Sequence, residues 1–437
     1  MNSLQYKDLL INFTTEFVPV WNDKGTRAEK PVSFWRPSTS SDTLGNFISL
    51  GDVAVADHHN INQLQVVAVV SDVDRVNGTA LRAPDDFERV WEHSGPRHRN
   101  AVSIWRPIAP EGYVALGLVC GVGNDKPPRN TIRCVREDLT THAYVDQLIW
   151  SDKGSGADRD FSAWGISTPQ PLPGEAYLAP GTFAGSEGFA KPTRHSVHAL
   201  RLDLTLQAKP LPPIPTIMSP EKLMAFSESD GTHVCELPWF TVRDPALTPL
   251  EQLQDCPIYR LQRKDQYTLV VSGQNTTPVS KTFSWTVAKG EIDTHSVDLR
   301  ALTGVNLEAE WLPRHPLNAS ARLSRDFTHT GLSAKGWGQT SLLDVMAYIP
   351  ANQSVGAYLV RSEYKLLRAD GSQLGQTLSY ANGDDVYFSE YPQPETALPA
   401  VVVPEALPEE VPGELPEPTE NSLEVMPGDF IDDPFLS

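Results

Sequence analysis

The chain has 437 residues, of which 40% are hydrophobic, with ten tryptophans and a formal net charge of −19. This length leaves room for two folded domains, and the negative charge argues against a nucleic-acid partner, because phosphate binding needs a basic surface. No apolar run is long enough for a helical membrane span, and the N-terminus lacks the pattern of a secretory signal.

Three copies of a tryptophan pair organise residues 1–208. Within each copy the two tryptophans are fourteen residues apart, a glycine stands four positions after the first, and a serine stands two positions before the second. Such a triplication predicts a repeat architecture. The six tryptophans are Trp21, Trp35, Trp91, Trp105, Trp150 and Trp164.

Each copy contains several short strands separated by turns rich in glycine and small polar residues. Three such units predict an all-β domain, in which three sheets close a threefold pseudo-symmetric prism around the tryptophans at the common axis. The polar loops of the repeats are candidate receptor-binding sites, although a turn-capping role is the simpler explanation for any single residue. The candidates are Asp52, Asp57, Asn124, Asp125 and Lys126.

The four cysteines are too few for a disulfide framework in a chain of this length. Cys120 and Cys134 flank a turn and can face each other across a hairpin, while Cys235 and Cys256 form a second loose pair. We favour four buried thiols and leave both pairings open.

Residues 209–220 contain five prolines and predict an extended, semi-rigid spacer. The following region, residues 221–391, alternates apolar and hydroxyl side chains, most clearly over 279–287 and less regularly over 303–311. An alternation with a period of two residues predicts strands with one apolar face and one solvent-exposed face. Asp370-Gly371 predicts a hairpin turn. We expect an elongated β domain here.

Strands of this length and pattern can also cross a membrane, with their apolar face toward lipid. One chain has too few of them to enclose a pore, so several subunits would contribute hairpins. A half-buried sheet gives the same alternation and is its commoner cause, and Lys281 lies on the apolar face. The candidate membrane-inserting residues are Val279, Phe283, Trp285, Val287, Val305 and Leu307.

The last segment, residues 392–437, contains ten prolines, and residues 391–437 hold eleven carboxylates without any Lys or Arg. This composition predicts a disordered acidic tail. The tail is either a solubilising segment or, through its acidic and aromatic end, a docking peptide for a protein partner.

No pattern typical of a catalytic or metal site is evident. Asp57-His58-His59 is similar to a set of metal ligands, but adjacent strand residues point to opposite faces and no second His or Cys pair supports it. Gly121-Val122-Gly123 lacks the Lys-Ser/Thr that would follow in a phosphate-binding loop. We therefore expect a non-enzymatic protein without a cofactor or a metal.

The repeat resembles the vacuolar protein sorting-associated protein 62 family, through Phe17–Gly25, Ser33–Pro37 and Trp105–Gly117. Residues from Ile149 onward are similar to the third repeat of that family, so the resemblance covers about residues 5–205. The copies depart from one another at Leu118, where the first copy has Asp52, and at Gly165, where the others have Arg. These departures bear on any site that needs three equal loops.

Residues 258–392 resemble the β module of aerolysin-like pore-forming and insecticidal toxins, through Ile258-Tyr259-Arg260-Leu261, the Ser/Thr-rich strands and Tyr391-Pro392. The resemblance implies a protein that is secreted, or released without a signal peptide, as a soluble monomer. Its prism would bind a glycan or lipid receptor on a target membrane, and a homo-oligomer would insert β-hairpins. The alternative is a non-enzymatic multivalent adaptor with a partner-docking acidic tail.

Overall fold

The computed structural model describes residues 3–93, 101–193, 196–211, 213–219, 231–314, 316–328 and 337–392. Within these ranges the fold is all-β, as predicted, and its α-helices are α1 (Pro249–Asp255) and α2 (Ser296–Thr303). Residues 1–393 form one compact unit. Apart from Pro392, the predicted acidic tail lies outside the described residues.

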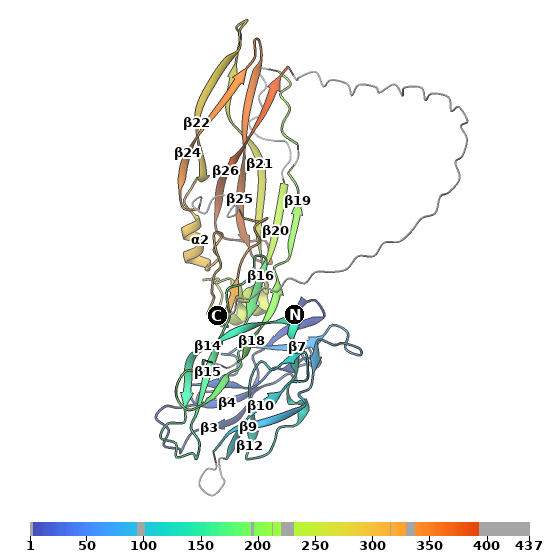
Figure 1. Cartoon of the computed structure of the whole chain (residues 1–437), viewed down its shortest axis with the longest axis vertical. Helices are drawn as coiled ribbons and strands as arrows, with labels where there is room; N and C mark the ends of the chain where they lie inside the picture. Colours follow the sequence, from blue (N-terminus) through green and yellow to red (C-terminus); the bar gives the residue numbers. More distant parts are fainter. Residues whose placement is uncertain are drawn as a thin grey trace, which may run out of the picture. The chain divides into compact units, whose positions relative to one another are not determined.

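The three sequence repeats form three equivalent three-stranded sheets (Figure 1). In each sheet, the strand that carries the second tryptophan lies between the strand that carries the first and a short third strand. This confirms the prism predicted from the tripled tryptophan pair. The strands are β3 (Phe17–Asn22), β4 (Ser33–Pro37) and β6 (Val53–Val55); β9 (Asp86–His93), β10 (Val102–Ile108) and β12 (Val119–Val122); and β14 (Thr140–Ser151), β15 (Phe161–Ser167) and β17 (Ala184–Glu187).

A further set of strands accompanies each repeat, and β14 extends into the third of these sets. In the first repeat the order is β1-β2-β7-β5, in the second β11-β13-β8, and in the third β14-β18-β16-β23. These strands are β1 (Leu4–Tyr6), β2 (Leu9–Thr14), β5 (Ile48–Ser49), β7 (Val67–Asp72), β8 (Leu81–Arg82), β11 (Tyr113–Val114), β13 (Cys134–Arg136), β16 (Glu175–Leu178), β18 (Val197–Asp203) and β23 (Ala319–Ala321).

The first tryptophans of the repeats meet at the centre of the prism. The ring centroids of Trp21, Trp91 and Trp150 lie 6.2, 6.5 and 5.8 Å apart in edge-to-face pairs. Each ring is at least nine-tenths buried. Edge-to-face packing of large buried rings stabilises a core beyond the area that it removes from water, so these three side chains hold the repeats together.

The second tryptophans do not lie on the axis, which corrects the expectation for Trp35, Trp105 and Trp164. They occupy three separate clusters, one in each repeat. The cause is a β-bulge in each hairpin, which shifts the register between the two tryptophans. A one-residue shift turns the following side chains to the opposite face of the sheet.

The serine of each repeat is hydrogen-bonded to its tryptophan. The indole Nε1 of Trp35, Trp105 and Trp164 donates to the hydroxyl two positions earlier, at 2.8, 2.9 and 2.8 Å. Each hydroxyl then donates to a backbone carbonyl of its own repeat. The Ser-x-Trp signal is therefore structural, because it satisfies a buried indole N–H.

The second half of the chain forms a seven-stranded antiparallel sheet in the order β19-β20-β21-β25-β26-β22-β24 (Figure 1). The β25–β26 pair closes around the predicted turn at Asp370-Gly371 and confirms that hairpin. The strands are β19 (Leu206–Lys209), β20 (Gly231–Pro238), β21 (Ile258–Gln274), β22 (Lys281–Glu291), β24 (Thr340–Ile349), β25 (Ser354–Leu367) and β26 (Gln373–Tyr391).

Residues 303–311 are not a strand, which corrects the second alternating segment. Helix α2 ends at Thr303, and Gly304 follows with a left-handed φ of 77° that favours glycine. The chain then continues without a ladder to an isolated bridge between Trp311 and Ala321. Its alternating side chains fill the core, so burial rather than strand pairing explains the period of two.

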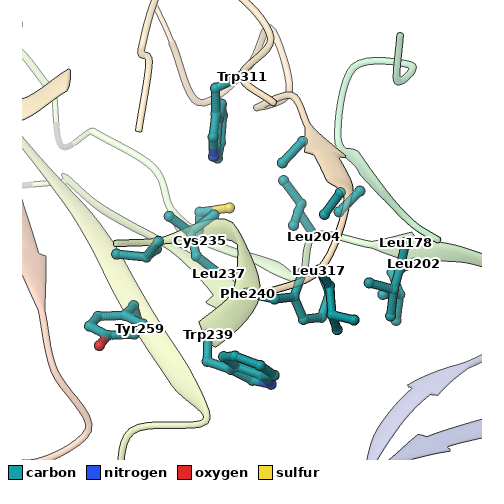
Figure 2. Close-up of a cluster of buried hydrophobic side chains, with 14 of the residues drawn as sticks. Leu178, Leu202, Leu204, Cys235, Leu237, Trp239, Phe240, Tyr259, Trp311 and Leu317 are labelled. Carbon is teal, nitrogen blue, oxygen red and sulfur yellow. The ribbon is translucent and has the colours of Figure 1, made fainter. Parts of the chain in front are cut away.

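One hydrophobic core joins the two halves of the described chain (Figure 2). Leu178 and Leu202 enter it from the prism, and Trp239 and Phe240 enter it from the segment after β20. The Phe13 ring of β2 packs against Trp239 with centroids 5.3 Å apart. The prism and the long sheet therefore share a continuous core.

The proline-rich segment packs against the long sheet. Ile217 is 2% exposed, and its N–H donates to the Ser389 hydroxyl of β26 at 3.3 Å. Leu211 and Ile214 contact the cluster that contains Tyr267 and Tyr358. The apolar side chains in the described part of the segment are therefore anchored on the long sheet.

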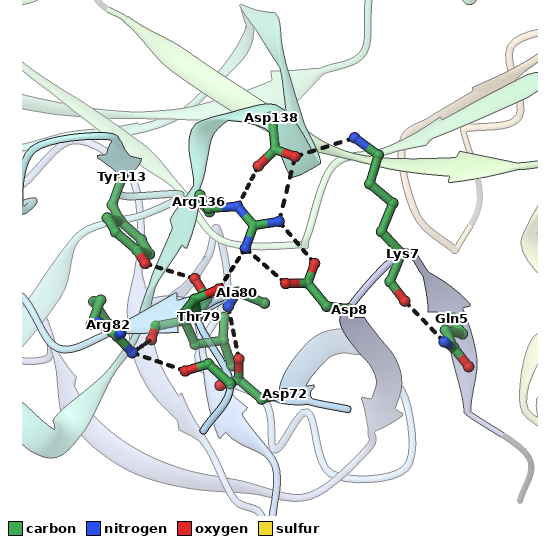
Figure 3. Close-up of polar contacts among 12 residues, drawn as sticks. Gln5, Lys7, Asp8, Asp72, Thr79, Ala80, Arg82, Tyr113, Arg136 and Asp138 are labelled. Atoms are coloured by element: carbon green, nitrogen blue, oxygen red, sulfur yellow. Dashed lines mark hydrogen bonds and ion pairs between the residues drawn. The ribbon is translucent and has the colours of Figure 1, made fainter. Parts of the chain in front are cut away.

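An ionic network ties the N-terminal hairpin to the second repeat (Figure 3). Arg136 donates from both Nη atoms to Asp8 at 2.7 and 2.9 Å and from Nε to Asp138 at 2.6 Å. These hydrogen bonds from Arg136 lower the pKa of Asp8 and of Asp138. A carboxylate with a lowered pKa stabilises the fold above its unfolded pKa, and this stabilisation is lost as the pH falls through the folded value.

We expect Arg136→Met to lower the free energy of unfolding at pH 7 by about 1 kcal/mol, the upper end for partly exposed pairs. The difference from the parent should shrink as the pH falls below the ordinary aspartate value of 3.8. Urea unfolding at pH 7 and at pH 3 measures it. Arg243→Met is the matched control, since its guanidinium donates to the carbonyls of Leu302 and Ala301. A pH-independent loss in Arg136→Met would contradict this role.

Candidate functional site

Asp52 is part of a repeat junction and is not exposed to a receptor. Its side chain is fully buried and accepts from Arg36 Nε at 3.0 Å and Nη2 at 2.8 Å. The same carboxylate accepts the backbone N–H of Cys120 at 2.7 Å, and Arg36 donates to the Cys120 carbonyl. Asp52 therefore links the first repeat to the second.

The other predicted receptor-binding residues are at the surface but belong to different repeats. Asp57 of the first repeat is half-exposed and lies 2.7 Å from His59 Nδ1, and this hydrogen bond lowers the pKa of Asp57. Asn124, Asp125 and Lys126 of the second repeat are exposed on the turn after β12. Lys126 Nζ pairs with Asp86 at 2.7 Å. These residues are accessible, and each repeat presents a different set.

The structure offers neither a reactive cysteine nor a cluster of metal ligands among the described residues. All four cysteines are free and buried, and burial raises the pKa of Cys134 and Cys235 to about 12. Such thiols are protonated and unreactive at neutral pH. Within the ranges given above, no group of three or more His, Cys, Asp or Glu is arranged to hold a metal ion.

Strands β22 and β24 form the most distinctive element, here called the ribbon. They pair continuously from Lys281 with Ile349 to Gly290 with Thr340. Among the described residues, β22 pairs with the rest of the sheet through Gly290–Ala381 and Glu291–Tyr380 alone. The ribbon therefore keeps its own ladder along its length and is joined to β26 by hydrogen bonds at one end.

The inner face of the ribbon is apolar between Lys281 and Lys289, which lie on it near its two ends, and it packs on the sheet. Phe283 and Trp285 of β22 stack with ring centroids 5.6 Å apart. A Cβ on Gly273 of β21 would lie 2.9 Å from the Trp285 ring and 2.8 Å from Ile349 Cδ1, so this glycine makes room for the close approach. The remaining contacts are between Val287, Leu343, Val345 and Ala347 of the ribbon and Val355, Ala357 and Leu359 of β25.

The outer face of the ribbon is open to solvent. β22 presents Thr282, Ser284 and Thr286, and Thr286 donates to Asp344 across the ribbon at 2.7 Å. β24 presents large apolar side chains on the same face: Leu342, Met346 and Tyr348, which are 73, 69 and 69% exposed. β24 is thus apolar on both faces, whereas β22 is amphipathic.

The structure brings Phe283, Trp285 and Val287 together on the inner face of the ribbon. The other predicted membrane-inserting residues lie elsewhere. Val279 is 64% exposed in the loop between β21 and β22, and Val305 and Leu307 are buried in the core shared by the two halves. Strand β24 was not predicted from the sequence, because residues 342–349 are apolar on both faces apart from Asp344 and show no clear period of two.

None of the described helices is long and apolar enough to span a membrane.

Comparison with known proteins relates the N-terminal half of the chain to a family. The crystal structure of GNIP1Aa from Chromobacterium piscinae aligns with 25% identity and a TM-score of 0.38, over 45% of this chain and 37% of that one. The crystal structure of Cry35Ab1 aligns with 12% identity and a TM-score of 0.32, over 89% and 91%. None of the curated proteins compared with the chain matches it. Residues 3–201 match the model of the vacuolar protein sorting-associated protein 62 family, so this part of the chain is similar to the domain of that family.

Proposed function

We propose that this protein is a toxin-like, membrane-permeabilising protein, in which the prism binds a glycan or lipid receptor and the ribbon enters the bilayer. The observation that carries the proposal is the ribbon itself. Its strands pair with each other throughout and conceal an apolar face. They hydrogen-bond to β26 at one end, and at the other end short loops connect them to β21 and β25. Such an element can leave the sheet without losing its own ladder.

The dimensions and energetics of the ribbon suit insertion. β22 has 11 residues and β24 has 10, and roughly 9–11 tilted residues cross the hydrocarbon layer. Detachment would expose Phe283, Trp285 and Ile349. In the bilayer, lipid would replace the sheet as their apolar surroundings, so these side chains would stay out of water. The backbone groups within the ribbon stay paired, as the bilayer requires.

The outer face would then line an aqueous passage. Thr282, Ser284, Thr286 and Asp344 supply its polar groups, and the exposed Leu342, Met346 and Tyr348 of β24 lie on the same face. One ribbon has two strands and leaves two open edges, which lipid does not tolerate. Several copies must therefore pool their ribbons, so we include homo-oligomerisation in the proposal.

The test is dye release from liposomes that differ in lipid and glycolipid content, with negative-stain imaging of the same samples. We expect Phe283→Asp on the inner face to reduce release about tenfold or more, since an aspartate at the membrane centre costs on the order of 2.5–3.5 kcal/mol on an insertion scale. Ser284→Asp on the outer face is the matched control and should retain release. Ring-shaped particles should accompany leakage.

Equal release by the two variants would refute the assigned orientation of the ribbon. Binding of the parent protein to liposomes without leakage would instead favour the adaptor alternative.

A further inference from the structure

A cavity of about 340 Å³ lies between the second and third repeats of the prism. Its walls are mainly aliphatic and aromatic, with Leu118, Ile166 and Phe183 among them. Two basic side chains, Arg106 and His198, also line it. This combination of an apolar body with a few polar groups is typical of small-molecule sites.

The cavity occurs where the pseudo-symmetry of the prism is broken. At the junction of the first and second repeats, the Asp52 N–H donates to the Leu118 carbonyl at 2.8 Å, and the buried Asp52 carboxylate holds Arg36. At the next junction, the Leu118 N–H donates to the Phe183 carbonyl at 3.3 Å. Leu118 thus occupies the position of Asp52 and supplies no carboxylate.

Arg106 is the counterpart of Arg36, and its ion pair differs accordingly. Its Nη1 pairs with Glu88 at 2.9 Å, and the two side chains are 43 and 59% exposed. The ion pair of Arg36 instead uses an aspartate side chain that is 1% exposed. Exposed pairs contribute little and exchange readily with other acids, so an acidic ligand can compete for Arg106.

His198 provides a second polar group at the cavity. It is 6% exposed, and among the described residues its Nδ1 has no hydrogen-bond partner. The exposed ring of His142 lies beside it, with centroids 4.9 Å apart. A buried, unpaired ring nitrogen is unusual, because leaving such an atom without a partner costs free energy. This Nδ1 atom is itself sealed from solvent, so a ligand head in the cavity would reach it only after the ring rotates.

We propose that this cavity binds a single-chain amphiphile with an acidic head, such as a fatty carboxylate. The chain packs against Leu118, Ile166 and Phe183, and the acidic head pairs with Arg106. A sugar ring fits poorly, since it needs several polar partners to replace those it has in water. The proposal concerns the soluble protein and does not depend on membrane permeabilisation.

Isothermal titration calorimetry of the full chain with decanoate, below its micellar concentration, tests the proposal. We expect saturable binding, and a loss of about tenfold in affinity for Arg106→Gln, the effect of removing one charge-assisted hydrogen bond. Arg89→Gln is the matched control, because Arg89 pairs with Glu92 at 2.8 Å at similar exposure and does not line the cavity. Its affinity should equal that of the parent.

A second variant tests the location of the chain. Ala115 lines the cavity and is partly exposed, so Ala115→Phe should fill the space and abolish binding without changing the thermal midpoint. Decanol, which has the chain but not the acid, should bind more weakly than decanoate. The proposal is overturned by an absence of saturable binding, by equal affinities of Arg106→Gln and Arg89→Gln, or by methyl galactoside binding in place of decanoate.

Discussion

A protein carrying Gly273→Cys and Ile349→Cys should release no dye from liposomes while oxidised, and should recover release when it is reduced. The two side chains face each other, since a Cβ on residue 273 would lie 2.8 Å from Ile349 Cδ1. A disulfide between these positions would tie β24 to β21. If the ribbon must leave the sheet to enter a membrane, this bond prevents it.

A second double-cysteine variant serves as the control. It tests whether a loss of release comes from attaching the ribbon to the sheet or from the disulfide itself. Ser284→Cys with Met346→Cys joins two directly opposed residues on the outer face of the ribbon. That bond links β22 to β24 without attaching them to the sheet, so release should continue. Undiminished release by the oxidised 273–349 protein would show that the ribbon does not need to move, and the proposed function would then lose its principal support.

Trp91→Ala should have the largest effect on stability, lowering the free energy of unfolding by about 3–5 kcal/mol. Trp91 is 1% exposed and packs against Trp21, Trp150 and Phe161. Truncation would leave a large cavity at the axis of the prism and would also remove the indole donor of Asp152 at 3.0 Å. Guanidinium unfolding followed by circular dichroism measures the loss.

Trp91→Phe distinguishes packing from hydrogen bonding at the same position. It retains an aromatic ring against Trp150 but leaves the Asp152 carboxylate without the indole N–H. We expect an intermediate loss of about 1–3 kcal/mol, the cost of a buried acceptor that loses its donor. A loss below about 1 kcal/mol for Trp91→Ala would mean that the axial tryptophans do not hold the repeats together.

The threefold repeat could be predicted from sequence because the interval between tryptophans reports a hairpin of constant size. Their orientation could not be predicted. An interval of fourteen residues does not determine whether Trp21 and Trp35 share a face, because that depends on the register of the hairpin. The bulge between Pro19 and Trp21 sets that register, since it pairs Trp21 with Phe34 and Trp35 with Pro19. A bulge leaves no mark in hydrophobic periodicity.

The ribbon was only half predictable for a related reason. The alternation over 279–287 predicts β22. The second alternating segment, 303–311, is not a strand and does not pair with it. The true partner, β24, follows a helix and lies about fifty residues further along the chain. Val305 and Leu307 are both buried in the shared core, although the chain forms no ladder here and bends from Leu307 to Ala309, so their spacing reports burial and not a strand.

Strand β23 limits how this molecule can be divided. Ala319–Ala321 belong to the second half of the sequence, yet they form the outermost strand beside β16 of the prism, with Ala176 opposite Ala321. A fragment ending at residue 208 would keep all three repeats but expose the hydrogen-bonding edge of β16, and such edges recruit foreign strands. The prism is therefore incomplete without β23. A fusion protein that contains the prism would need residues 319–321 or another strand in their place.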